Sequence, residues 1–150
     1  MKNRIAHEMF AVDAASQKLG IELMELDDGY ARMSMVITED MVNGHAITHG
    51  GYVFLLADTT FAMACNSYAD PAVAARCDIR YVRPTKAGDV LMADAVERAR
   101  FGKNGIYDVT VTSGDTVIAE FRGDSRTMRP RQEPRVGGER RATPPHNTGT

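Results

Sequence analysis

The sequence predicts an α+β fold in which one antiparallel β-sheet wraps around a single long helix. Two features predict it. Segments with strand character are joined by short turns, and such neighbours run antiparallel because a parallel return needs a crossover of about a dozen residues or more. In addition, residues 52–67 form the one long helix candidate, and only three polar residues interrupt their apolar run before Asn66, which is typical of a buried helix.

A short helix and a hairpin come first along the chain. The helix is predicted at residues 13–20, with Asp13 near its N-cap and Gly20 at its end. Two strands follow on either side of an Asp-Asp-Gly turn signal, at residues 21–26 and 30–37.

Four more strands are predicted after the long helix. Apolar and polar residues alternate with a period of two over residues 73–81, which is the pattern of a strand with one buried face. Turns that contain glycine then separate three further strand segments, at residues 90–100, 106–112 and 116–125.

The composition changes at residue 129. Residues 129–150 hold four of the six prolines, five arginines and two glutamates, with almost no large apolar side chains. This composition predicts a disordered tail of charge +3 after a folded domain at residues 1–128, whose charge is −5 because the whole chain carries −2.

Net charge, apolar runs and cysteine content exclude several classes of protein. The sequence pI near 6.1 is not that of a nucleic-acid-binding protein. The charged N-terminus lacks the apolar core of a secretory signal, and no apolar run reaches transmembrane length, so we expect a cytoplasmic protein without a membrane partner. Cys65 and Cys77 have no Cys-x-x-Cys spacing, so neither a disulfide framework nor a structural zinc site is expected.

Asp58 is the one carboxylate inside the predicted buried helix. Burying an unpaired carboxylate costs several kcal/mol, so such a residue is retained for function or is satisfied by hydrogen bonds, here most simply across a subunit interface. We favour a functional role because of the residues that precede the helix.

Backbone and amide donors lie just ahead of Asp58. Gly50 and Gly51 precede the helix, whose first N–H groups lack partners and whose dipole is positive at this end, so they can stabilise an oxyanion and leave the backbone open to a substrate carbonyl. The side-chain amide of Asn43 can hold a water or that carbonyl. Each of these pairs also has an ordinary structural explanation when taken alone. The Gly-Gly pair is typical of a junction between a loop and a helix, and Asn43-Gly44 is typical of a tight turn.

Two histidines flank these groups. His45 and His49, with Asp58, could suggest a metal site, but the residues between the histidines do not have a helical pattern, so no metal is expected. His49 is expected to fix the loop before the oxyanion donors.

Helix geometry separates the two halves of this constellation. Gly50 and Asp58 are eight residues apart, which is about 12 Å along a helix. One carbonyl carbon therefore cannot easily contact both groups of one chain. Two such helices, antiparallel about a two-fold axis, would bring Asp58 of one chain against Gly50 of the other, so we expect a site shared between subunits.

With these residues assembled, the chain resembles the hotdog-fold acyl-CoA thioesterases, and within them the PaaI (phenylacetic acid degradation) type, over residues 5–128. The resemblance is carried by Asn43-Gly44-His45, His49-Gly50-Gly51, Leu56-Ala57-Asp58-Thr59, Ala64-Cys65-Asn66-Ser67, Arg83-Pro84, Ala87-Gly88-Asp89 and Gly105-Ile106-Tyr107-Asp108. It implies a sheet wrapped around a central helix, homodimers with the active site between subunits, often paired into tetramers, and no metal or organic cofactor.

The resemblance also implies roles for single residues. Asp58 matches the catalytic carboxylate, acting as nucleophile or as general base toward water. Gly50 matches the backbone oxyanion donor, Asn43 the amide that orients carbonyl or water, and His49 the supporting histidine. Arg76 departs from the family, which usually has a small or hydroxyl residue there near the acyl pocket, so we expect this long cation to alter the pocket or to contact coenzyme A.

The implied reaction is hydrolysis of an acyl-CoA thioester with an aryl-acetyl, phenylacetyl-type group. Because coenzyme A carries phosphates, basic residues near the cleft are candidates to bind it. These candidates are Arg83, Lys86, Lys103 and Arg122, beside Gly51 and Arg76 as further substrate-binding residues. Two alternatives stay open: a non-catalytic acyl-CoA sensor, and a hotdog enoyl-CoA hydratase or dehydratase that would use His49 or His45.

Overall fold

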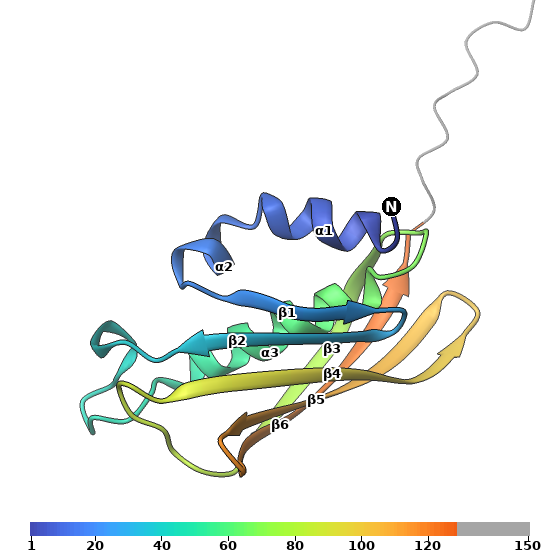
Figure 1. The fold of residues 1–150 in the computed structure, drawn as a ribbon. Helices are drawn as coiled ribbons and strands as arrows, with labels where there is room; N and C mark the ends of the chain where they lie inside the picture. The colour runs from blue at the N-terminus through green and yellow to red at the C-terminus, as the bar shows by residue number, and fades with distance from the viewer. Residues whose placement is uncertain (129–150) are drawn as a thin grey trace, which may run out of the picture.

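Six antiparallel strands form one sheet, in the order β1-β2-β4-β5-β6-β3, in the computed structural model (Figure 1). The structure describes residues 1–128, and the disordered tail predicted for residues 129–150 lies outside the described residues. The strands are β1 (Glu22–Asp27), β2 (Tyr30–Val36), β3 (Ala72–Tyr81), β4 (Val90–Phe101), β5 (Asn104–Ser113) and β6 (Thr116–Thr127). Each lies within two residues of its predicted range, so the antiparallel sheet is confirmed.

The long helix α3 (Gly50–Cys65) lies across one face of this sheet and contacts all six strands (Figure 1). It begins two residues earlier than predicted because His49 adopts an extended conformation and caps its first turn. The predicted central helix is therefore confirmed. Among the described residues, no helix is long and apolar enough to cross a membrane.

Three short helical segments complete the fold. The helix α2 (Ala14–Lys18) has the predicted cap, since the Asp13 side chain accepts a hydrogen bond from the Ser16 N–H. A 3-10 turn, η1 (Glu39–Met41), precedes the loop that leads to α3. The sequence analysis did not predict α1 (Arg4–Ala11), which packs against α3.

The start of α1 is held by tertiary contacts. Its N-cap residue Asn3 has a left-handed φ of 56° and makes no side-chain cap bond. Instead, Asn3 Nδ2 donates to the Ser67 backbone oxygen at 2.7 Å and to Asp28 Oδ1 at 3.0 Å. Because these partners are distant in sequence, no local capping signal marks this helix.

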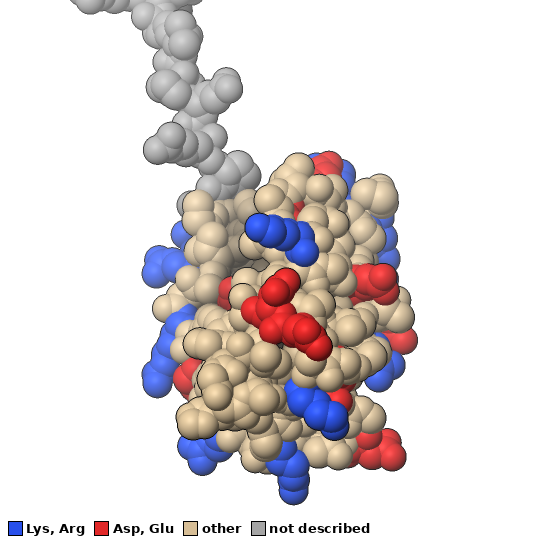
Figure 2. Space-filling model, turned by 90° about the vertical axis from the view of Figure 1, so that its left-hand side faces the viewer, with Lys and Arg blue, Asp and Glu red and all other residues tan. Residues whose placement is uncertain are grey.

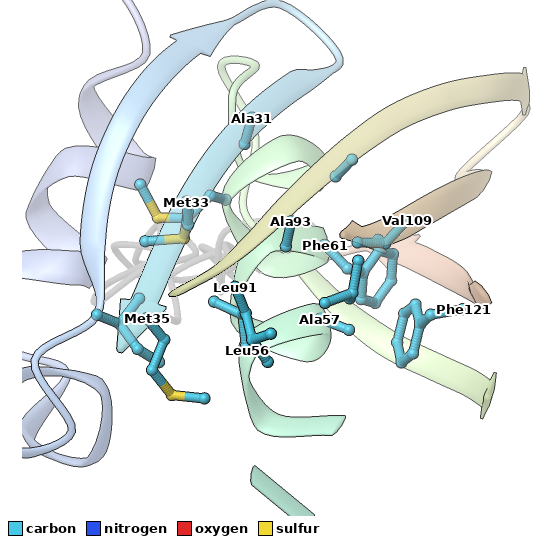
Figure 3. Packing of buried hydrophobic residues seen from close by; sticks show 14 of the residues in the cluster. Ala31, Met33, Met35, Leu56, Ala57, Phe61, Leu91, Ala93, Val109 and Phe121 are labelled. Atoms are coloured by element: carbon cyan, nitrogen blue, oxygen red, sulfur yellow. The ribbon is translucent and has the colours of Figure 1, made fainter. Parts of the chain in front are cut away.

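The core lies between α3 and the inner face of the sheet (Figure 3). The fully buried side chains of α3 include Leu56, Ala57 and Phe61. They meet one alternating set of strand residues, among them Met33, Met35, Leu91, Ala93, Val109 and Phe121. Burial of each large side chain contributes about 1.5–3 kcal/mol, so this layer fixes the position of α3 and hence of the groups at its two ends.

Gly123 on β6 lets the Phe61 ring pack directly on the sheet. A Cβ at this position would lie 2.8 Å from three atoms of the Phe61 ring. We therefore expect Gly123→Ala to lower the free energy of unfolding by about 1–3 kcal/mol, measured by urea denaturation. Gly44→Ala is the control, because a Cβ there meets no atom within 4 Å; equal losses in both variants would contradict this packing.

One face of α3 is left uncovered by the sheet. Leu55, Asp58 and Ala62 follow one another at helical spacing and are half-buried, and Gly51 continues this stripe as an exposed residue. The stripe runs beside β3, which forms an edge of the sheet. A partly apolar helix face and an open strand edge therefore lie side by side.

Candidate active site

Within residues 1–128, the first turn of α3 carries one backbone donor that has no acceptor. The His49 side chain accepts a hydrogen bond from the Gly51 N–H through Nδ1 at 3.3 Å, so that donor is already engaged. The Gly50 N–H, by contrast, has no acceptor within residues 1–128. Since the helix dipole is positive at this end, the Gly50 N–H is placed to stabilise a negative oxygen. His49 thus lies next to the site and orders its loop.

Tyr81 closes over the same glycine from the end of β3. Its hydroxyl donates to the Gly50 backbone oxygen at 2.9 Å. A Cβ at Gly50 would lie 2.9 Å from Tyr81 Cζ, so the close approach of ring and backbone requires glycine. The sequence analysis did not single out Tyr81 as a site residue. The period-two pattern of residues 73–81 could have identified Tyr81, because it places Tyr81 on the face of the strand that meets α3.

The oxygen of the Asn43 side-chain amide is used in a local turn, and its nitrogen remains available to a ligand. Its Oδ1 accepts hydrogen bonds from the His45 N–H at 2.9 Å and the Ile47 N–H at 3.5 Å, which is the local turn that the alternative interpretation expected. Asn43 Nδ2 donates to no residue in the described part of the chain. The turn therefore fixes the amide and leaves its donor available.

The loop that carries Asn43 is anchored to the rest of the fold. Val42 and Thr48 form an isolated antiparallel bridge that closes it. Thr85 Oγ1 donates to Thr48 Oγ1 at 2.7 Å, and this pair is buried. Asn43 is therefore held by a short closed loop beside α3, although it lies outside helix and strand.

A cavity of about 550 Å³ opens at this end of α3. Its walls are mainly apolar, from Ile47, Val53, Val82, Pro84 and Ile118, and its polar groups come from Asn43, Thr48, Gly50, Tyr81, Arg83 and Thr85. The structure therefore brings Asn43 and Gly50 together at one cavity. Asp58 does not line it, which agrees with the separation expected from helix geometry.

Asp58 lies on the uncovered stripe of α3, against β3. It is half-buried, and the Cys77 thiol donates to its Oδ1 at 3.8 Å. Burial raises the pKa of Asp58 above its ordinary value; the negative charge of Asp13 acts in the same direction, and the Cys77 thiol opposes it. Cys77 itself is a half-buried thiol, and burial, with Asp58 nearby, raises its pKa to about 11, so it stays protonated and can donate.

The basic residues are spread over the chain. Arg83 lines the cavity, and its guanidinium donates to the Val117 backbone oxygen at 3.5 Å. Lys86 lies in the adjoining loop, with Nζ 3.9 Å from Asp89 Oδ1. Arg76 is exposed on β3, opposite Asp124 of β6. Of these three candidates, therefore, Arg83 alone contacts the same cavity as Gly50 within one chain.

The two remaining basic candidates lie elsewhere in the single chain. Lys103 is in the β4–β5 turn, at the Cys65 end of α3, where its backbone oxygen accepts from the Thr127 N–H. Arg122 forms a two-pronged ion pair with Asp108, at 2.6 and 2.9 Å, on the sheet face that points away from α3. On the face shown in Figure 2, acidic and basic side chains are interspersed and form no large patch of one sign.

Within residues 1–128, no group of three or more histidine, cysteine, aspartate or glutamate side chains could hold a metal ion. The site groups described above are a backbone donor, a side-chain amide and a carboxylate whose pKa is raised.

Comparison with known proteins gives the family. A family model described as the thioesterase superfamily matches residues 45–120. The chain is 43% identical over 124 residues to acyl-coenzyme A thioesterase PaaI of Escherichia coli (strain K12), which covers 82% of this chain and 89% of that protein. It is 32% identical over 124 residues to a putative esterase of Archaeoglobus fulgidus, covering 82% of this chain and 80% of the relative.

A solved structure agrees with the sequence relatives. The E. coli PaaI protein from the phenylacetic acid degradation operon matches with a TM-score of 0.81 and 42% identity, covering 83% of this chain and 91% of that one. The predicted hotdog fold and the predicted class of enzyme, a thioester hydrolase, are confirmed at the level of the family. The chain belongs to the thioesterase superfamily, and the acyl-coenzyme A thioesterase PaaI of E. coli is among its relatives.

Proposed function

We propose that the protein hydrolyses an acyl-CoA thioester to a free acid and coenzyme A. The observation that carries the proposal is the Gly50 N–H at the positive end of α3, which has no acceptor among residues 1–128 and lies at a mainly apolar cavity. A donor in this setting stabilises the oxyanion of acyl transfer far better than it would in water. The name of the E. coli relative, an acyl-coenzyme A thioesterase, supports the same reaction.

The proposed chemistry assigns each group one task. The thioester oxygen accepts from the Gly50 N–H, and Asn43 Nδ2 orients that oxygen or the attacking water. Asp58, as general base, takes a proton from the water while the water oxygen adds to the carbonyl carbon. The C–S bond then breaks, the thiolate takes up that proton, and the acid and the free thiol leave. With Asp58 as nucleophile, its carboxylate would add to the carbonyl carbon and the C–S bond would break, which leaves an acyl-aspartate anhydride and the coenzyme A thiolate. Water would then hydrolyse the anhydride to the free acid and the Asp58 carboxylate, and the proton released would go to the thiolate.

The proposed site is shared between two copies of the chain. The separation of about 12 Å between Gly50 and Asp58 prevents one carbonyl carbon from contacting both within a chain. The uncovered stripe of Leu55, Asp58 and Ala62 supports a second α3 lying antiparallel to the first. A two-fold axis in this position makes two equivalent sites, and pairs of such dimers would give a tetramer.

We infer an aryl-acetyl, phenylacetyl-type acyl group. A mainly apolar cavity of about 550 Å³ has room for an aromatic ring. The operon of the solved relative, that of phenylacetic acid degradation, points to the same class. Arg83, at the cavity, is the basic residue best placed to meet a phosphate of coenzyme A, and a coenzyme A ester as substrate fits a cytoplasmic location.

A thiol-release assay over a panel of acyl-CoA esters tests this function. We expect kcat/KM to be highest for phenylacetyl-CoA and lower for acetyl-CoA and long alkyl esters. An enoyl-CoA in the same panel separates hydrolysis from hydration, because hydration consumes the double bond without releasing thiol. Tight binding of every ester with no thiol release would contradict the proposal and support a sensor.

The Cys77 thiol makes the proposal testable by pH. Because its hydrogen bond favours the ionised form of Asp58, Cys77→Ala should raise the pKa of Asp58 further. The acid limb of the pH profile of kcat/KM should then move to higher pH, since the base works only when ionised. Cys77→Ser keeps a donor and should leave the limb at or below its wild-type position. An unmoved limb in Cys77→Ala would contradict the role of this contact.

A further inference from the structure

The proposed oxyanion donor belongs to a residue with little backbone restraint of its own. Gly50 has no Cβ, and it is followed by Gly51, which has none either. A donor in an oxyanion hole is effective because it is held in position before the reaction, so that no free energy is spent on turning it toward the substrate. Contacts from outside the first turn of α3 therefore matter more at Gly50 than at a residue with a side chain.

Two side chains hold the peptide unit that joins Gly50 to Gly51, one at each end. The Gly51 N–H of this unit donates to His49 Nδ1 at 3.3 Å. The Gly50 oxygen of the same unit accepts from the Tyr81 hydroxyl at 2.9 Å. Because a peptide unit is planar, these two contacts fix its plane. They thereby restrain Gly50, whose own N–H lies at the cavity.

The two contacts differ in origin. His49 is the N-cap residue of α3 and belongs to the loop that it orders, so its contact is local. Tyr81 lies at the end of β3, 31 residues further along the chain, and this strand pairs with β6. The Tyr81 contact therefore ties Gly50 to the sheet.

We propose that Tyr81 is a positioning residue for thioester hydrolysis, which holds the Gly50 N–H in the direction of the thioester oxygen. The inference rests on the proposed function, because that function gives the oxyanion to Gly50. Tyr81 lines the same cavity, but its hydroxyl carries a single proton and donates it to the Gly50 oxygen. It therefore acts through Gly50 and is not a second donor to the oxyanion.

The Tyr81 ring also explains why residue 50 is glycine. The φ of Gly50 is not in the left-handed region, so its backbone conformation would accept alanine. A Cβ there would lie 2.9 Å from Tyr81 Cζ, 3.0 Å from its hydroxyl oxygen and 3.2 Å from Cε1. At Gly51, by contrast, a Cβ would lie 3.5 Å from the nearest atom, which is an ordinary contact. The three atoms nearest to a Cβ at residue 50 all belong to Tyr81, so this ring is what excludes a side chain there.

Removing the hydroxyl alone tests the positioning role. Tyr81→Phe keeps the ring beside Gly50 and should lower kcat for thiol release about 2–10-fold, the usual weight of one hydrogen bond. KM should stay within about twofold of the wild-type value, because the bond acts on the donor and not on the bound ester. The acid limb of the pH profile should stay in place, because the contact between Asp58 and Cys77 is kept.

Tyr52→Phe is the matched control. It removes the same group from the first turn of α3, and Tyr52 does not line the cavity. Both variants are assayed at a temperature at which circular dichroism shows them to be folded. An unchanged kcat in Tyr81→Phe, an equal fall in Tyr52→Phe, or a loss that lies wholly in KM would overturn the inference.

A double-mutant cycle gives a second test. Gly50→Ala keeps the backbone N–H but brings a methyl group against Tyr81, so the donor is displaced and kcat should fall about 10-fold or more. In a Tyr81→Ala background the ring is absent, and Gly50→Ala should then cost less than about twofold. The melting temperature should follow the same pattern without any substrate. Equal effects of Gly50→Ala in the two backgrounds would show that the ring does not restrain Gly50, which contradicts the inference.

Failure of the inference and failure of the proposed function give different results. If the wild-type protein releases no thiol from any ester, the proposed function fails, and this inference fails with it. If the wild-type protein is active and Tyr81→Phe keeps full kcat, the inference alone fails.

Discussion

Replacing Asp58 with asparagine should reduce kcat for thioester hydrolysis by about 10²–10⁴-fold, the usual contribution of a general base. Asparagine has nearly the same shape and can still accept from the Cys77 thiol at 3.8 Å, but it cannot take a proton or form an acyl intermediate. Thiol release from the preferred ester measures the effect. Asp115→Asn, in an exposed turn between β5 and β6, is the matched control and should keep wild-type activity.

The same substitution should leave the fold at least as stable as the wild type. Because the folded-state pKa of Asp58 is raised, its ionised form is less favourable in the fold than in the unfolded chain. Asp58 therefore contributes stability when protonated at low pH and loses it as pH rises through the folded pKa. At neutral pH, Asp58→Asn should melt at the same temperature or higher, and this advantage should disappear on acidification. Full activity, or a large loss of stability at neutral pH, would contradict the role given to Asp58.

The sheet and the long helix were predictable because their signals are local. Period-two alternation, turns with glycine and one long apolar run are each visible within about ten to fifteen residues of sequence. By contrast, α1 depends on Asn3 reaching Asp28 and Ser67 across the fold, so the sequence near it carries no sign of its start.

The sequence was enough to predict which residues form the candidate site, but not which contacts those residues make. The amide, the glycine pair and the lone carboxylate stood out by residue type around one helix start. The Gly51 N–H donates to His49, whereas the Gly50 N–H has no acceptor in the described part of the chain, and this difference depends on how the loop enters α3. The approach of Cys77 to Asp58 and of Tyr81 to Gly50 depends on how β3 crosses α3, which no local pattern contains.

Activity should be restored by mixing two inactive variants. Asn43→Asp keeps an oxygen that can accept from the His45 and Ile47 N–H groups, so the turn survives, but it loses the Nδ2 donor. Loss of one such donor costs about 10²–10³-fold in kcat. In a dimer of one Asn43→Asp chain and one Asp58→Ala chain, one site receives both defects and the other receives Asp58 and Asn43 intact.

Complementation is therefore the most direct test that the site is shared. Random assembly of equal amounts gives about half mixed dimers, each with one intact site of two, so we expect about a quarter of wild-type activity. Dimers of each variant alone, mixed without subunit exchange, are the control. If mixed dimers form, as native mass spectrometry would show, and thiol release stays at the level of the separate variants, then Asp58 and Asn43 of the same chain form the site and the shared arrangement is wrong.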